Sequence, residues 1–184
     1  MRYARLLALS ATIYNFAIDL ADADRNRYET LALRVPRHPS ESEEYLATRL
    51  LAFCLEYEEG IAFSNGLSDP DEPTIAIRDL TGAVRVWIEI GTPDAARLHK
   101  ASKAADRVAV YTHKDPGQLL RQLEGERLHR ADAIEIYSFD RGFIATFADK
   151  LDRRMAFAVS VADRHVMVAL ETAVLEGDIT RHRI

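Results

Sequence analysis

The side chains best suited to chemistry lie between Asp71 and Lys103. Two adjacent carboxylates, Asp71 and Glu72, precede one stretch of alternating apolar residues, and Glu89 lies near the end of the next. A segment that carries Lys100 and Lys103 follows directly. Carboxylates suit a divalent cation such as Mg²⁺, and a lysine beside them suits a phosphate. Charges at the solvated ends of structural elements are the alternative explanation of the same pattern.

Two strands joined by a tight turn are predicted to position these carboxylates. Apolar residues alternate with polar or small ones over 75–77 and again over 84–90, which is typical of half-buried strands. A two-residue turn at Thr81-Gly82 brings both apolar sets to one face. The resulting opposite pairs are Ile77 with Val86 and Ile75 with Ile88. Glu89 then lies on the other face with Glu72 diagonal to it, while Asp71 points to the opposite side.

A helix and a buried strand are predicted to follow the hairpin. Residues 95–105 are rich in helix formers. The positions expected to face inward are Leu98, Ala101, Ser102 and Ala105, and those expected to point elsewhere are Arg97, Lys100 and Lys103. Arg107–His113 is apolar enough to lie inside a sheet. The strand, helix and strand between Val84 and Tyr111 therefore predict a right-handed parallel crossover, which places a cationic helix behind the carboxylates.

The rest of the chain predicts further strands and helices around this unit. Hairpins are expected near both ends, so that the fold class is α/β (α+β), a single domain with a mixed sheet and flanking helices. The predicted elements are strands Thr12–Leu20 and Tyr28–Val35, an edge strand Ile61–Ser64, a helix Asp115–Gln122, a strand Ala133–Phe139, a helix Asp140–Leu151, and a hairpin of Met155–Val161 with His165–Leu170. Asn65–Pro70 is predicted to be a loop, and Arg181–Arg183 a solvated face or tail.

A first helix is predicted to begin at Ser40. Ser40 followed three residues later by Glu43 fits a capping box, and the helix is expected to end near Glu59-Gly60. Glu41 and Glu44 lie one turn apart and are secondary candidates for the metal site. Their alternative role is a favourable charge near the positive end of the helix.

Composition narrows the classes of protein that fit. The chain has 184 residues and a net charge of −5, which disfavours broad coating of nucleic acid but leaves room for a local basic groove. Its single cysteine, Cys54, excludes an internal disulfide, and no Cys/His cluster predicts zinc. No stretch approaches the length that spans a membrane, and the apolar run near the N-terminus is too short for a signal peptide. A reducing cytoplasm is the expected location.

The sequence also resembles the YaeQ family of bacterial proteins. The matching strings, in the family's order and near its spacing, are ATIY at 11–14, RHPSE at 37–41, RLLA at 49–52, GL at 66–67, DEP at 71–73, WIE at 87–89 and KA at 100–101. Similarity continues to about residue 170. Relative to the family, residues 1–7 look like an N-terminal extension, which we expect to be poorly packed.

The family is regarded as a compact variation on the PD-(D/E)XK, or restriction-endonuclease-like, fold. That resemblance implies that Asp71 or Glu72 is the first acidic residue of the motif and Glu89 the second. The motif has a lysine two residues after the second acid, whereas this chain has Gly91 there. Lys100, on the next helix, is the residue that would restore the charge from another backbone position.

Two functions follow from these observations. The first is a magnesium-dependent nuclease that hydrolyses phosphodiester bonds, in which Asp71, Glu72 and Glu89 hold Mg²⁺ and Lys100 stabilises charge on the attacked phosphate. The second is a non-catalytic protein of the same fold that binds nucleic acid or a protein partner. Gly91 favours the second function, and clustering of Glu72, Glu89 and Lys100 would favour the first.

Overall fold

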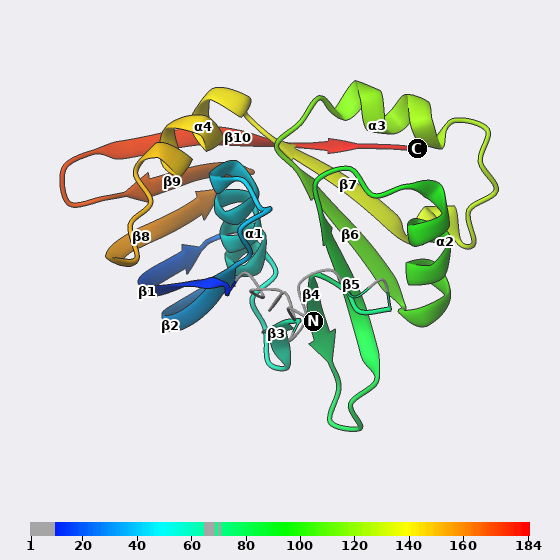
Figure 1. Cartoon of the computed structure of the whole chain (residues 1–184), viewed down its shortest axis with the longest axis horizontal. Helices are drawn as coiled ribbons and strands as arrows, with labels where there is room; N and C mark the ends of the chain where they lie inside the picture. Colours follow the sequence, from blue (N-terminus) through cyan, green and yellow to red (C-terminus); the bar gives the residue numbers. More distant parts are fainter. Residues whose placement is uncertain (1–9, 65–68, 70) are drawn as a thin grey trace, which may run out of the picture.

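One mixed β-sheet organises the fold. The computed structural model describes residues 10–64, 69 and 71–184, which form ten strands and four α-helices (Figure 1). In chain order these are β1 (Thr12–Asp22), β2 (Arg27–Arg37), α1 (Glu43–Leu55), β3 (Ile61–Phe63), β4 (Ile75–Arg78), β5 (Val84–Ile90), α2 (Ala95–Ala104), β6 (Arg107–Thr112), α3 (Pro116–Leu123), β7 (Ile134–Phe139), α4 (Arg141–Asp149), β8 (Arg154–Ala162), β9 (His165–Ala169) and β10 (Val174–His182). The strand order is β2-β1-β8-β9-β10-β7-β6-β5-β4-β3.

The predicted mixed sheet, hairpins and crossover are confirmed. β1 pairs antiparallel with β2, and β8 pairs antiparallel with β9. β1 runs parallel to β8, so the two terminal hairpins lie side by side in one half of the sheet. In the other half β5, β6 and β7 are parallel, with α2 connecting β5 to β6 and α3 connecting β6 to β7.

Of the two alternatives predicted for Arg181–Arg183, the tail is wrong, whereas a solvated face agrees with the exposed side chains of Arg181 and Arg183. β10 pairs with β9 over Val174–Asp178 and with β7 over Ile179–His182, so it joins the two halves of the sheet. Arg181 forms an ion pair with Glu135 at 3.0 Å. His182 Nε2 lies 2.7 Å from the hydroxyl of Ser138. The strand was missed because its apolar residues are few and a glycine interrupts them.

The helices cover the sheet in two layers. α1 and α4 pack on the concave face, where the larger hydrophobic cluster lies, and α2 and α3 cover the outer face of β5–β7 (Figure 1). Neighbouring residues of β5 contribute to different layers, because side chains alternate between the two faces of a strand. Ile88 packs in the cluster of α1, whereas Trp87 packs in the cluster of α2. The outer cluster also contains Leu98, Ala101 and Ala105, as predicted for the inward face of α2. Among the described residues no helix is long and apolar enough to cross a membrane.

α1 begins two residues later than predicted. Ser42 is the N-cap, and its hydroxyl accepts a hydrogen bond from the Tyr45 N–H at 3.1 Å. The Ser40 hydroxyl instead lies 2.6 Å from His38 Nδ1 in the preceding turn. The helix also ends earlier than predicted, with Glu56 as its C-cap. Burial of Cys54 in this helix raises the pKa of its thiol to about 12, so the thiol stays protonated.

The β4–β5 register is confirmed, but its turn is wider than predicted. Ile77 pairs with Val86 and Ile75 with Ile88, while a bulge makes Arg78 pair with Val84. The Asp79 carboxylate accepts hydrogen bonds from the N–H groups of Thr81 and Ala83 and closes the loop. The predictions of a loop at 65–70 and of a poorly packed extension at 1–7 fall largely or wholly outside the described residues.

Replacing Gly177 tests how closely β10 packs against α4. A Cβ at this position would lie 2.7 Å from the Cβ and Cγ atoms of Phe143 on α4, closer than packed side chains approach. We expect Gly177→Ala to lower the free energy of unfolding by about 1–3 kcal/mol, measured by urea denaturation. Glu176→Ala, on the exposed neighbour, is the control, with an expected change within about 0.5 kcal/mol. Equal stabilities of the two variants would contradict this packing.

Candidate functional site

A cavity of about 580 Å³ lies where the first two turns of α1 approach the ends of β4, β5 and β6. The carboxyl ends of the parallel strands β5 and β6 open toward it, which is where α/β folds commonly bind ligands. Its lining residues are Ser40, Glu41, Ser42, Tyr45, Arg49, Ser64, Asp69, Glu72, Pro73, Thr74, Glu89, Arg97, His113 and Lys114. Three of the predicted acids, Glu41, Glu72 and Glu89, therefore share one cavity.

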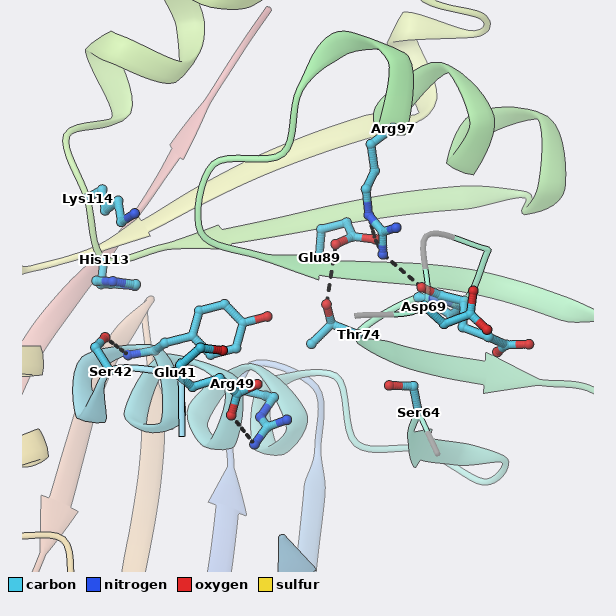
Figure 2. Close-up of a pocket in the computed structure, with 14 residues that line it drawn as sticks. Glu41, Ser42, Arg49, Ser64, Asp69, Thr74, Glu89, Arg97, His113 and Lys114 are labelled. Atoms are coloured by element: carbon cyan, nitrogen blue, oxygen red, sulfur yellow. Dashed lines mark hydrogen bonds and ion pairs between the residues drawn. The ribbon is translucent and has the colours of Figure 1, made fainter. Parts of the chain in front are cut away.

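Glu89 is held by three side chains, from its own strand β5, from α2 and from the residue before β4. Its residue is 4% exposed, and its Oε1 accepts hydrogen bonds from the indole N–H of Trp87 and from Arg97, whose Nε lies 2.9 Å away. Thr74, opposite Glu89 in the hairpin, donates to Oε2 at 3.3 Å. Figure 2 shows Arg97 reaching from α2 onto the carboxylate and Thr74 on its other side. Both oxygens of Glu89 thus already accept protein donors.

Arg97 also links this carboxylate to the segment before β4. Its Nη2 donates to the backbone carbonyl of Glu72 at 2.8 Å, and its guanidinium lies 5.7 Å from the ring centroid of Trp87. Arg97 is therefore the basic residue that pairs with Glu89, whereas the sequence predicted Lys100 as the basic residue beside the carboxylates. Lys100 forms an ion pair with Asp71, and the Glu72 carboxylate pairs with Arg78 at 2.9 Å.

A second ion pair lines the α1 side of the cavity. Arg49 is 2% exposed and donates from Nη2 to Glu41 at 3.2 Å and to the Pro36 carbonyl at 2.6 Å. Its Nε has no hydrogen-bond partner among the described residues. Burial raises the pKa of Glu41, and the nearby Arg49 guanidinium opposes that rise. Glu44, the other secondary candidate, lies on an adjoining cavity with His113 and Lys114.

His113 and Lys114 complete the polar wall beyond the end of β6 (Figure 2). The Nδ1 atom of His113 is buried without a hydrogen-bond partner among the described residues. Burial lowers the pKa of His113, and the positive charges of Lys114 and Arg141 lower it further, while Glu44 opposes them. The neutral imidazole is therefore favoured in the folded protein.

These contacts do not fit the predicted magnesium site. Glu89, Glu72 and Asp71 are each paired with a different basic side chain, so their charges are already balanced. In the described part of the chain no three His, Cys, Asp or Glu side chains come together as metal ligands. A magnesium site would need several unoccupied oxygen ligands around one point.

Sequence reasoning missed Arg97, Thr74 and Arg49. The predicted hairpin register already implies that Thr74 lies opposite Glu89, so that contact was available from the pattern. Arg97 follows the N-cap Asp94 by three residues, which places it at the strand-proximal end of α2. Arg49 carried no comparable signal, because a charged residue in the interior of an apolar helix is expected to face solvent.

Comparisons with known proteins agree with this fold. The sequence model of the family described as YaeQ protein matches residues 7–178. The uncharacterized protein YaeQ of Salmonella typhi is 33% identical over 175 residues, which span 95% of this chain and 97% of that protein.

Two solved structures extend the similarity to three dimensions. The crystal structure of YaeQ protein from Pseudomonas syringae superposes with a TM-score of 0.82 at 30% identity, covering 93% of this chain and 95% of that one. The YaeQ protein from Xanthomonas axonopodis pv. citri gives a TM-score of 0.84 at 26% identity, covering 95% and 99%. The resemblance read from the short sequence strings is confirmed.

Removing Arg97 tests the interaction that holds Glu89. Because the Glu89 side chain is 5% exposed, Arg97→Ala leaves a buried carboxylate without its cation. Arg97 itself is 24% exposed, so we expect a loss of about 2–3 kcal/mol in the free energy of unfolding, somewhat below that of a fully buried pair. Lys103→Ala, on the exposed side of the same helix, is the control. A loss no larger than the control's would show that the pair is not structural.

The lowered pKa of His113 predicts a pH effect. Since the folded state favours the neutral ring, protonation opposes folding, and stability is lost as pH falls from the unfolded pKa of 6.5 through the lower folded value. His113→Gln removes this loss. We therefore expect the stability of the variant relative to the original protein to rise between about pH 7.5 and pH 5.5, measured by urea denaturation at each pH. A difference that stays constant with pH would contradict the prediction.

Proposed function

The chain belongs to the YaeQ family, and we propose that its first cavity binds phosphate groups of nucleic acid without hydrolysing them through magnesium. The observation that carries the proposal is the pairing of Glu89 with Arg97. This contact places a guanidinium where the predicted mechanism needs a metal ion. Guanidinium groups suit phosphate oxygens because they donate two parallel hydrogen bonds.

Three cationic side chains and one neutral imidazole that line the cavity support an anionic ligand. Arg49 comes from α1, Arg97 from α2, and His113 and Lys114 from the segment after β6. Arg97 is partly exposed and Lys114 is exposed, so both are accessible from the cavity. The hydroxyl groups of Ser40, Ser42 and Ser64 line the same space and add hydrogen-bonding capacity. A volume of about 580 Å³ falls in the range of cavities that hold small organic ligands.

The ligand that we favour is a single-stranded segment or a strand end. The net charge of −5 and the acidic residues Glu41, Asp69 and Glu72 at the cavity oppose the long phosphate array of a duplex. A single strand can present one or two phosphates to the cavity while its other phosphates remain in solvent. We also propose that the half of the sheet that contains β4–β7 is a PD-(D/E)XK-like core.

A magnesium-dependent nuclease is the second candidate. The observation in its favour is that Glu41, Glu72 and Glu89 line one cavity. Asp71, which directly precedes Glu72, forms an ion pair with Lys100. This function would require Arg97 to leave Glu89. Hydrolysis of a labelled oligonucleotide that needs Mg²⁺ and is abolished by Glu89→Gln would establish it in place of the binding function.

Fluorescence anisotropy with a short single-stranded oligonucleotide tests the proposed binding. In buffer containing a chelator we expect saturable binding that weakens with added salt. Lys114→Ala should weaken binding about three- to tenfold and reduce its salt dependence, because one phosphate contact is removed. The free energy of unfolding should stay unchanged, because Lys114 is exposed. Lys103→Ala, whose side chain is exposed on α2 away from the cavity, is the matched control. Absence of binding, or equal weakening by both variants, would overturn the proposal.

A further inference from the structure

A second cavity lies at the opposite end of α1. Its volume is about 300 Å³, and it shares no lining residue with the cavity described above. The lining residues are Asp22, Asp24, Arg25, Leu55, Glu56, Glu58, Ile77, Arg107, Tyr111, Tyr137, Val161, Arg164 and Ile179. They come from the β1–β2 turn, the end of α1, the β8–β9 turn and six strands of both halves of the sheet.

One wall of this cavity is a polar cluster whose members satisfy one another. The Glu56 carboxylate accepts hydrogen bonds from Arg107 at 2.8 and 2.9 Å and from the Tyr111 hydroxyl at 2.6 Å. Arg107 also donates to Glu135 at 2.6 Å, and Glu135 accepts a bond from Tyr137. Glu56 and Arg107 thus form a closed network, and these residues build the wall of the cavity without requiring a ligand.

Asp22 differs from this cluster because its buried carboxylate accepts hydrogen bonds from backbone groups only. The residue is 1% exposed, and its carboxylate accepts hydrogen bonds from the backbone N–H groups of Arg25, at 3.1 Å, and Asp24, while among the described residues no side chain donates to it. The guanidinium of Arg25 is directed instead to the carbonyls of Leu55 and Tyr57. A carboxylate has about four acceptor positions, and buried ones are normally filled. Burial also raises the pKa of Asp22, with the Arg25 N–H and charge opposing the rise.

The surroundings of Asp22 favour a positively charged group. The cavity lies at the C-terminal, negative end of the α1 dipole, with Asp24 and Glu58 also on its lining. Apolar side chains form the rest of its surface, namely Leu55, Ile77, Val161 and Ile179. A metal ion does not suit this donor set, since no three metal-ligating side chains converge in the described residues. Three arginines, Arg25, Arg107 and Arg164, line the same cavity against its four carboxylates, so a ligand with two positive charges is disfavoured.

We propose that this cavity binds a small primary alkylammonium ion, with the ammonium group donating to Asp22 and the alkyl group packed on Leu55, Ile77 and Val161. The ammonium group donates to acceptor positions of the Asp22 carboxylate that the backbone N–H groups of Arg25 and Asp24 leave open. The alkyl group removes water from the apolar wall. Because the two cavities share no lining residue, this site can fail or succeed independently of the nucleic-acid site.

Titration of isoamylammonium chloride into the full chain, followed by ligand-observed NMR near neutral pH, tests the proposal. We expect saturable binding in the millimolar range or tighter. Isoamyl alcohol has the same alkyl group without the charge and should bind about tenfold more weakly, because it lacks the charge-assisted hydrogen bond.

Asp22→Asn should weaken binding of the ammonium ion about tenfold and leave binding of the alcohol unchanged. The variant is expected to fold, because it replaces a buried carboxylate with a neutral group of similar size whose side-chain oxygen can still accept the backbone hydrogen bonds. Its urea midpoint should be equal to or above that of the original protein. Glu58→Gln, a charge change on the same lining at a partly exposed side chain, is the matched control and should weaken binding less. No saturable binding of the ammonium ion, equal binding of the alcohol, or a folded Asp22→Asn variant that binds unchanged would overturn the proposal.

Discussion

The burial of α1 on all sides is the constraint on which the rest of the structure depends. Ten consecutive residues of this helix, Leu46–Leu55, are buried, so it has no solvent-facing side over most of its length. A helix of this kind must be enclosed rather than laid on a surface. The sheet curves around it, and residues from both halves of the sheet join α1 and α4 in one hydrophobic cluster. β10, hydrogen-bonded to β9 and β7, makes this enclosure continuous.

Enclosure of the helix leaves its two ends as the places where polar groups collect. The first and last turns of a helix carry unpaired backbone groups that need partners or water. At the N-terminal end, Ser42 caps the helix and Arg49 pairs with Glu41. At the C-terminal end, Arg25 caps the carbonyls and Arg107 pairs with Glu56. Each end therefore combines a cavity with an arginine–carboxylate pair, buried at the N-terminal end and partly buried at the C-terminal end, and the pairs fix how the helix sits in the sheet.

Sequence patterns predicted the elements whose signal is local. The period-2 alternation gave the correct β4–β5 register and thereby the face that carries Glu89, because a shift of one residue would bury the wrong side. Patterns failed where tertiary contacts decide. Ser40 and Ser42 are equally good caps by type, and the preceding turn determines which one is used. β10 is weakly apolar and is held by its neighbours, whereas Arg97 has its role only because α2 lies over β5.

The central claim is that the charge of Glu89 is balanced by Arg97 and not by a metal ion. Calorimetric titration of Mn²⁺ into the protein, alone and with a bound single-stranded oligonucleotide, tests it most directly, since the oligonucleotide supplies the phosphate ligands that a magnesium-type site can need. We expect no heat that depends on Glu89 in either titration. Saturable Mn²⁺ binding that Glu89→Gln abolishes would contradict it and restore the metal-dependent mechanism.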